Sequence, residues 1–228
     1  MPLPPAQWSG PLLAKTMSKS ARSALRRTTR LAAAVIGLAA IAGCTDAPSR
    51  AATGTATVPV PATQWDHRPE AREWTLSTMG AIEDFGTSLI ETPLADISTF
   101  CPGYKDATDI DRMAFWVGLF SGLARYESTW NPEAAGAGGR YRGLLQIFPQ
   151  TARYRGCDIN GAGELYDGAT NLSCAVRIAA AAVERDGVVA GSPGNWGGVA
   201  ADWPPMRNAR KRAEIASFTS KQDYCQGG

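Results

Sequence analysis

One stretch of the chain is apolar on almost every face that a helix can present, and this feature constrains the fold more than any other. It begins after Asp109 or Asp111, either of which can cap a helix, and Pro132 can end it. A stripe at spacings of three and four residues runs through Met113, Trp116, Phe120, Leu123 and Glu127. Polar side chains keep to a narrow line of Ser121, Arg125 and Ser128. A helix with so little polar surface must be buried on most sides, so the sequence predicts a central helix in a mainly helical domain.

Glu127 is the exception on the apolar stripe, because it places a carboxylate at the end of a buried face. Loss of hydration penalises the charged form of a carboxyl group, so we expect a raised pKa and a proton that is retained near neutral pH. The alternative is a glutamate at a frayed helix end that turns outward to solvent. The helical pattern alone leaves both interpretations open.

The N-terminal region has the pattern of an export signal. Residues 1–44 contain six basic residues and no acidic one, and residues 31–43 form an uncharged apolar run. Thirteen residues are too few for a membrane-spanning helix, which needs about 20, but they suit a signal peptide. The run ends in Ile41-Ala42-Gly43-Cys44, which resembles the lipobox of bacterial lipoproteins. We therefore predict a signal peptide over residues 1–43, starting at Met1 or Met17, and a lipidated Cys44; a simple secretory signal or a buried helix is the alternative.

The segment that follows Cys44 has the composition of a linker. Residues 45–63 contain no aromatic residue and are rich in Ala, Thr and Pro, so they bury too little surface to fold. We predict a lipidated cysteine and flexible tether over residues 44–64 and one folded domain over residues 65–225. Within that domain, a helical pattern runs from Trp65 to Ile90, a second helix runs from a cap at Thr170 or Asn171 to a stop at Gly187, and a final helix spans residues 207–218.

Charge and histidine content exclude several classes of function. Beyond Cys44 the chain holds 17 basic and 21 acidic residues, so no basic surface supports nucleic-acid binding. His67 is the single histidine, which rules out a multi-histidine zinc site. It also lies beside the predicted linker, where a rigid Ser-His or Cys-His catalytic pair is not expected. The basic cluster of the final helix is interpreted as a solvated face, or as a patch that meets an anionic polymer; it comprises Arg207, Arg210, Lys211 and Arg212.

Four cysteines remain after Cys44 is set aside, and an even number in an exported chain indicates two disulfides. Of the three possible pairings we favour Cys157 with Cys174, which closes a short loop, and Cys101 with Cys225, which ties the two ends of the domain together. Buried free thiols are the alternative. A metal site is disfavoured because the chain has no Cys-x-x-Cys spacing.

Three short motifs follow the central helix in order: ESTWNP at residues 127–132, GLLQI at residues 143–147 and PQTA at residues 149–152. Over residues 101–187 the chain thereby resembles the SLT-type lytic transglycosylases of the lysozyme-like superfamily. The resemblance implies a mainly α, lysozyme-like α+β fold, with a single helical domain, a substrate cleft and minimal β structure. It implies no metal and no organic cofactor.

The resemblance also assigns roles to individual residues. Glu127 takes the place of the catalytic acid and base. Gly143, Leu145, Gln146 and Ser128 take substrate-binding places: Gly143 lets the backbone pass close to a sugar, Leu145 lies against the sugar, and Gln146 exchanges hydrogen bonds with the glycan. Leu144 and Ile147 are interpreted as core residues. Two departures from the family pattern affect the distal subsites, since Gly136 stands where a serine is common and Asp202 stands where an aromatic residue is usual.

The activity that follows from the resemblance is cleavage of peptidoglycan glycan strands between N-acetylmuramic acid and N-acetylglucosamine, with formation of a 1,6-anhydro product. A hydrolytic muramidase of the same fold is the first alternative and needs a second carboxylate, for which Asp158, Asp167 and Asp202 are candidates. A non-catalytic peptidoglycan-binding lipoprotein is the second. The expected partners are the glycan strands and a membrane, held through Cys44. Thr45 in place of an aspartate favours the outer membrane, with the domain facing the periplasm.

Overall fold

The computed structural model describes residues 60–226. The predicted signal peptide, Cys44 and most of the predicted tether lie outside these residues. No helix within the described range is long and apolar enough to cross a membrane.

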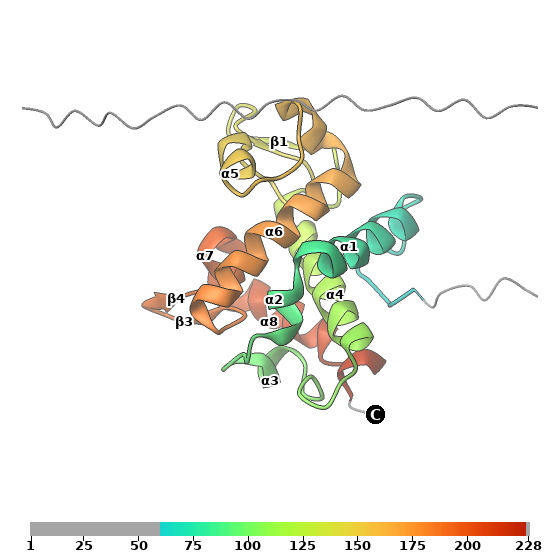
Figure 1. The fold of residues 1–228 in the computed structure, drawn as a ribbon, viewed down its shortest axis with the longest axis vertical. Coiled ribbons are helices and arrows are strands. Elements are labelled where there is room, and N and C mark those ends of the chain that lie inside the picture. The colour runs from blue at the N-terminus through green and yellow to red at the C-terminus, as the bar shows by residue number, and fades with distance from the viewer. Residues whose placement is uncertain (1–59, 227–228) are drawn as a thin grey trace, which may run out of the picture. The chain divides into compact units, whose positions relative to one another are not determined.

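Helices make up most of this range, as the sequence predicts (Figure 1). The α-helices are α1 (Ala71–Phe85), α2 (Thr87–Glu91), α3 (Ile97–Phe100), α4 (Asp109–Glu127), α5 (Pro149–Tyr154), α6 (Gly168–Asp186), α7 (Val199–Asp202) and α8 (Ala209–Thr219). Three 3₁₀ turns add η1 (Ala162–Tyr166), η2 (Pro204–Arg207) and η3 (Asp223–Cys225).

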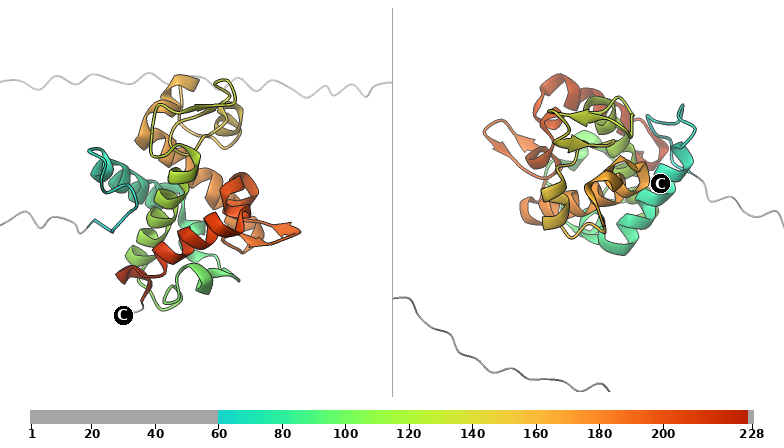
Figure 2. Two further views of the ribbon diagram at one scale, coloured as in Figure 1. Left: turned by 180° about the vertical axis from the view of Figure 1, so that it is seen from behind. Right: turned by 90° about the horizontal axis from the view of Figure 1, so that it is seen from above.

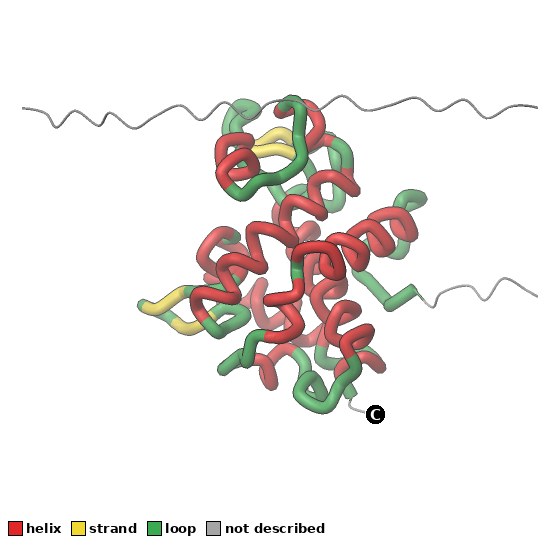
Figure 3. The backbone as a smooth tube through the Cα atoms, viewed as in Figure 1, coloured by secondary structure: helices red, strands yellow, loops and turns green. Residues whose placement is uncertain are grey.

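The β structure consists of two short antiparallel hairpins, drawn in yellow in Figure 3. In the first, β1 (Ala135–Gly136) pairs with β2 (Tyr141–Arg142), and Ala135 lies opposite Arg142. In the second, β3 (Gly191–Ser192) pairs with β4 (Asn195–Trp196), and Gly191 lies opposite Trp196. The prediction of minimal β structure is therefore confirmed for the described residues.

The central element is α4, and its burial confirms the interpretation of the apolar stretch. Helices α1, α2 and α8 pack against it, and the view from behind in Figure 2 shows α8, in red, crossing α4, in green. Every residue from Met113 to Ala124 is buried. Ser121, one of the three residues of the narrow polar line, is also buried and has no exposed surface.

Ser121 is buried because the chain preceding α1 packs over it. The Ser121 hydroxyl donates to the Gly118 carbonyl (2.6 Å) and accepts from the Gln64 backbone N–H (2.9 Å). Thr63 is also buried, and the Ala62 carbonyl accepts from the Tyr224 hydroxyl at 3.3 Å. Residues 62–64, predicted as the end of the tether, are therefore part of the folded domain.

The helix boundaries differ from the sequence prediction where a cap or a close contact decides them. Thr108, rather than Asp109 or Asp111, caps α4 by accepting from the Asp111 N–H at 3.2 Å. Asp167, rather than Thr170 or Asn171, caps α6 by accepting from the Thr170 N–H at 2.8 Å. In both cases the predicted residue lies inside the first turn, where its side chain cannot reach the free N–H groups from outside. Gly187 ends α6 in a left-handed conformation, as predicted.

The helical pattern of residues 65–90 forms two helices instead of one, and α1 begins only at Ala71. The break falls at Gly86, where a β-carbon would lie 2.7 Å from Cγ1 of Val176 on α6. Close packing against α6 therefore requires a glycine at this break. The final helix, α8, begins at Ala209 because the Asn208 side chain caps it by accepting from the Lys211 N–H at 3.0 Å.

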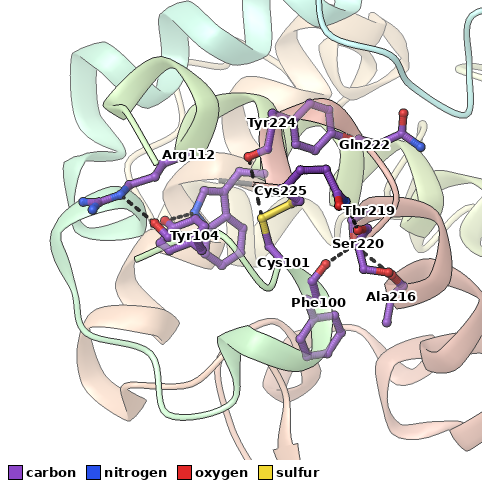
Figure 4. The surroundings of a disulfide bond; sticks show 12 residues. Phe100, Cys101, Tyr104, Arg112, Ala216, Thr219, Ser220, Gln222, Tyr224 and Cys225 are labelled. Atoms are coloured by element: carbon purple, nitrogen blue, oxygen red, sulfur yellow. Dashed lines mark hydrogen bonds between the residues drawn. A yellow bond between two sulfur atoms is a disulfide. The ribbon is translucent and has the colours of Figure 1, made fainter. Parts of the chain in front are cut away.

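Both predicted disulfides are present. Cys101 and Cys225 join the chain after α3 to η3, with their Cα atoms 4.8 Å apart (Figure 4). Nearby, the Gly103 N–H donates to the Cys225 carbonyl (2.8 Å) and the Thr219 hydroxyl donates to the Phe100 carbonyl (2.7 Å). The second disulfide, between Cys157 and Cys174, joins the chain after α5 to α6.

Candidate active site

Glu127 is the last residue of α4, and the backbone after it is held in an unusual conformation. Thr129 and Trp130 have φ angles of 55° and 56°, in the left-handed region that residues with side chains rarely adopt. The Trp130 N–H donates to the Ala124 carbonyl (3.3 Å), and its indole N–H donates to the Ser121 carbonyl (2.9 Å). These bonds end the helix directly after Glu127 and fix the direction in which its side chain leaves α4.

The Glu127 carboxyl group is in the environment that its place on the apolar stripe predicts. Its Oε1 atom is buried and has no hydrogen-bond partner among the described residues. Burial raises the pKa of Glu127 to about 7, and the positive charge of Lys211 acts in the opposite direction. Near neutral pH the group therefore exists in both protonation states, which suits a proton donor that later accepts a proton.

The Glu127 side chain opens into a cleft of about 300 Å³. Its other lining residues come from three further parts of the chain: Tyr141, Gln146, Asp202, Trp203 and Pro204. A smaller adjoining pocket shares Tyr141, Gln146, Asp202 and Trp203 and extends past Phe148 to α5 and α6. The central helix, the first hairpin, the 143–147 loop and the α7–η2 segment therefore meet at one site.

Asp202 is the one of the three candidate second carboxylates that lies in this cleft. Burial raises its pKa, although the charges of Arg155, Arg185 and Arg207 oppose the shift. Asp167 instead caps α6, and Asp158 lines a different pocket between α1 and α6.

Gln146 lines the cleft, but its side-chain amide can only accept a hydrogen bond from a ligand, whereas the sequence predicts that it both donates and accepts. Its side-chain N–H groups donate to the carbonyls of Ala134 (3.0 Å) and Gly143 (2.9 Å). Both donors are thus used by the backbone, which leaves the Oε1 atom to accept a hydrogen bond from a ligand. A β-carbon at Gly136 would lie 2.3 Å from that oxygen, so the glycine in the usual place of a serine leaves room for Gln146.

The other three predicted substrate-binding residues have structural roles instead. Gly143 has a φ of 77°, and a β-carbon there would lie 2.0 Å from the Leu165 carbonyl oxygen, so packing against η1 rather than a sugar requires glycine. The Leu145 side chain is fully buried in the core, as are those of Leu144 and, almost completely, Ile147. The Ser128 hydroxyl donates to the Ala124 carbonyl at 3.2 Å and does not line the cleft.

Comparison with known proteins agrees with this geometry. Residues 109–187 match the family described as Transglycosylase SLT domain, a range that includes Glu127 and the 143–147 loop. This chain contains a transglycosylase SLT domain. Members of the family are lytic transglycosylases that act on peptidoglycan, and the chain is an enzyme of this class.

Three solved structures of DslA have the same fold as this chain. Their TM-scores are 0.68, 0.66 and 0.65 at 28%, 27% and 26% identity, over 74% of this chain and 100% of theirs. One is the wild-type protein, and the other two are glutamate-to-glutamine variants. No curated protein matches the sequence significantly.

Asn171 and Trp203 hold the 143–147 loop, called the motif loop below, in place. The sequence did not predict this role for either residue. The Asn171 side chain accepts from the Leu145 N–H and donates to the carbonyls of Arg142 and Leu165, all at 2.9 Å. From the other side, the Trp203 indole N–H donates to the Leu145 carbonyl at 2.9 Å. The sequence predicts Asn171 as a possible helix cap because it lies near a helix start. In the structure its side chain is fully buried.

Within the described range no cluster of three or more His, Cys, Asp or Glu side chains could hold a metal ion. His67 lies away from the cleft-lining residues, with its ring 4.7 Å from that of Trp130.

The raised pKa of Glu127 predicts the pH dependence of the enzyme. A general acid, which is the role that the SLT motif implies for Glu127, must be protonated to donate to a leaving group. The protonated fraction of Glu127 falls as the pH rises through about 7. We expect activity on peptidoglycan to decline about tenfold for each pH unit above that value. Initial rates between pH 5 and 9 would test this, and constant activity up to pH 9 would contradict it.

Proposed function

We propose that the chain cleaves the β-1,4 bond between N-acetylmuramic acid and N-acetylglucosamine and leaves a 1,6-anhydro-N-acetylmuramic acid end. The observation that carries this proposal is the Glu127 carboxyl group, which lies in a cleft with Oε1 buried and a pKa of about 7. A single carboxyl group of this kind can serve both halves of a non-hydrolytic cleavage.

In the first half, the Glu127 proton passes to the glycosidic oxygen while the bond from that oxygen to the muramyl C1 breaks. In the second half, the muramyl 6-hydroxyl oxygen bonds to C1 and its proton returns to the Glu127 carboxylate. The enzyme ends in its starting protonation state, and no water is consumed. The Gln146 Oε1 atom supports positioning, because it is left to accept a hydrogen bond from a sugar amide or hydroxyl group.

A hydrolytic muramidase is the second candidate, and Asp202 is the observation that favours it. A retaining or inverting glycosidase uses two carboxyl groups on either side of the scissile bond, and Asp202 lines the same cleft as Glu127. In the transglycosylase, Asp202 has no direct chemical step.

Mass analysis of the products from purified sacculi separates the two candidates. We expect anhydro-muropeptides, which are lighter than hydrolytic products by one water, from both the wild type and Asp202→Asn. Asp202→Asn should lose less than about tenfold in rate, below the range typical for a general acid or base. Asp158→Asn, outside the cleft, is the matched control. Hydrated products together with a loss of about 10²-fold or more in Asp202→Asn would establish the hydrolase instead.

We also propose that Cys44 is lipidated and holds the enzyme at the outer membrane, facing the periplasm. The support is the apolar run of residues 31–43 that ends in Ile-Ala-Gly-Cys. Cys44→Ser should move the enzyme from the membrane to the soluble fraction, and unchanged fractionation would refute the anchor.

A further inference from the structure

A further concavity is lined by residues of α4, of α8 and of the chain ends that flank them. This α8 groove, as we call it, has a volume of about 570 Å³ and runs between α4, α8 and the chain near Gln64. Its charged lining residues are Arg125, Arg210, Glu214 and Lys221, and Phe218 and Ala213 contribute apolar surface. None of these residues lines the cleft at Glu127.

The α8 groove has an excess of positive charge, with three cationic side chains and one carboxylate. Glu214 is shared between Arg125 (3.6 Å) and Arg210 (3.9 Å), at distances that leave both guanidinium groups free to bind further acceptors. The Arg210 side chain is 83% exposed. Lys221 forms no ion pair within the described part of the chain. The groove can therefore offer at least two cationic groups to an anionic ligand.

The α8 groove and the cleft approach each other at the end of α4, where Arg125 lines the groove and Glu127 lines the cleft. The Tyr126 hydroxyl donates to Glu214, and the Arg125 guanidinium lies 5.4 Å from the centre of the Tyr126 ring. Lys211 has its Nζ atom 5.1 Å from the same ring, and its charge acts on Glu127. The arrangement brings the α8 groove to the edge of the site where the glycosidic bond is cleaved.

We infer that the α8 groove binds an acidic peptide, namely the carboxylate-bearing peptide that is attached to the muramic acid of the strand in the cleft. This inference rests on the proposed function. A peptide on the sugar next to the scissile bond leaves the glycan close to Glu127. Arg125, which lines the α8 groove, is only two residues from Glu127 on α4. Arg125 and Arg210 can bind carboxylates in the two-pronged manner that a guanidinium group allows, and the apolar surface at Phe218 can pack against aliphatic side chains of the peptide.

An anionic membrane surface is the competing occupant, and the form of the site disfavours it. A membrane presents its charges in a plane, whereas these cations line a concavity and two of them converge on one carboxylate. Discrete carboxylates on a narrow chain reach such groups more readily than headgroups in a bilayer do.

The test compares two substrates: peptide-bearing glycan strands with free carboxylates, and the same strands after their carboxylates have been converted to amides. We expect the wild-type full chain to show a KM roughly five times lower for the acidic strands, as two exposed charge pairs would provide. The double variant Arg210→Gln/Lys221→Gln should lose this difference and keep its kcat on both substrates. Arg72→Gln/Lys105→Gln, which removes two exposed cations elsewhere, should retain the difference.

Three outcomes would overturn the inference: a wild type that does not distinguish the substrates, a double variant that still does, or a double variant that weakens equally on both. If the double variant instead loses binding to phosphatidylglycerol vesicles while it keeps the KM difference between the substrates, the groove is a membrane site.

Titration of the isolated acidic tetrapeptide into Glu127→Gln protein measures the affinity of the groove for the peptide without catalysis. Peptide binding that disappears at 1 M salt and in the double variant supports the inference even if no strand is cleaved, in which case the proposed function alone fails.

Discussion

Glu127→Gln is expected to lower the rate of glycan cleavage by about 10²–10⁴-fold, the range typical of general acid–base catalysis. The substitution keeps the shape of the side chain and its place at the end of α4 but removes the transferable proton. Binding of glycan strands should be retained, because the remaining cleft-lining residues are unchanged. Product release from sacculi and strand binding, measured on the same preparation, test the two parts of this prediction.

Glu133→Gln is the matched control, since this glutamate lies six residues further along the chain, is exposed and does not line the cleft. It should keep wild-type activity. Full activity in Glu127→Gln would refute the assignment of the catalytic acid.

Glu127→Gln should also change how the stability of the folded protein depends on pH. The folded protein holds the Glu127 proton up to a pH of about 7, whereas a carboxyl in the unfolded chain releases it near pH 4.5. The stabilisation from the protonated form is therefore complete below pH 4.5 and is lost as the pH rises through about 7. Glu127→Gln escapes this loss, so we expect its melting temperature relative to wild type to be higher at pH 8 than at pH 4. A difference that does not change with pH would mean that Glu127 is not desolvated.

Removal of the long-range disulfide is expected to cause the largest loss of stability. Cys101 and Cys225 are 124 residues apart, and chain-entropy arguments give a contribution of about 4–5 kcal/mol for a loop of that length. Cys101→Ala/Cys225→Ala should lower the free energy of unfolding by about that amount, measured by urea denaturation. The bond fastens η3 to the segment after α3, so its loss should also loosen the end of α8 that contacts α4.

Cys157→Ala/Cys174→Ala provides the comparison. These residues are 17 apart in sequence, which corresponds to about 3 kcal/mol. A smaller effect from the long-range pair than from the short-range pair would show that loop closure is not the main source of stabilisation.

Features that depend on one continuous segment were predictable from the sequence. The apolar pattern of α4 appears within 19 residues, so the burial of the helix and the position of Glu127 on its apolar stripe follow from periodicity. Periodicity left open whether the Glu127 carboxyl group itself is buried. The sequence also limited the disulfides to three possible pairings, and the structure confirmed the one that was favoured. The two motifs at residues 127–132 and 143–147 identified the family, since each is local and their order is preserved.

The roles within the motif loop were not predictable, because they depend on neighbours that are remote in sequence. Gly143 and Leu145 belong to the motif but face η1 and the core, whereas the Gln146 donors are used by backbone carbonyls. A sequence pattern says which residues a family shares; it does not say which of them point toward the ligand.

The sequence alone therefore determined the helical class of the domain and its central helix, and it favoured the two cysteine pairs and Glu127 as the candidate acid. Only the tertiary structure decided which of three aspartates joins Glu127 in the cleft, that Asn171 and Trp203 hold the motif loop, and that α8 forms a cationic groove beside the site. The physical reason is distance along the chain. Helical periodicity is set by neighbours three and four residues apart, but Asp202 lies 75 residues beyond Glu127 and reaches the cleft only because α7 and η2 pack back onto α4 and α6.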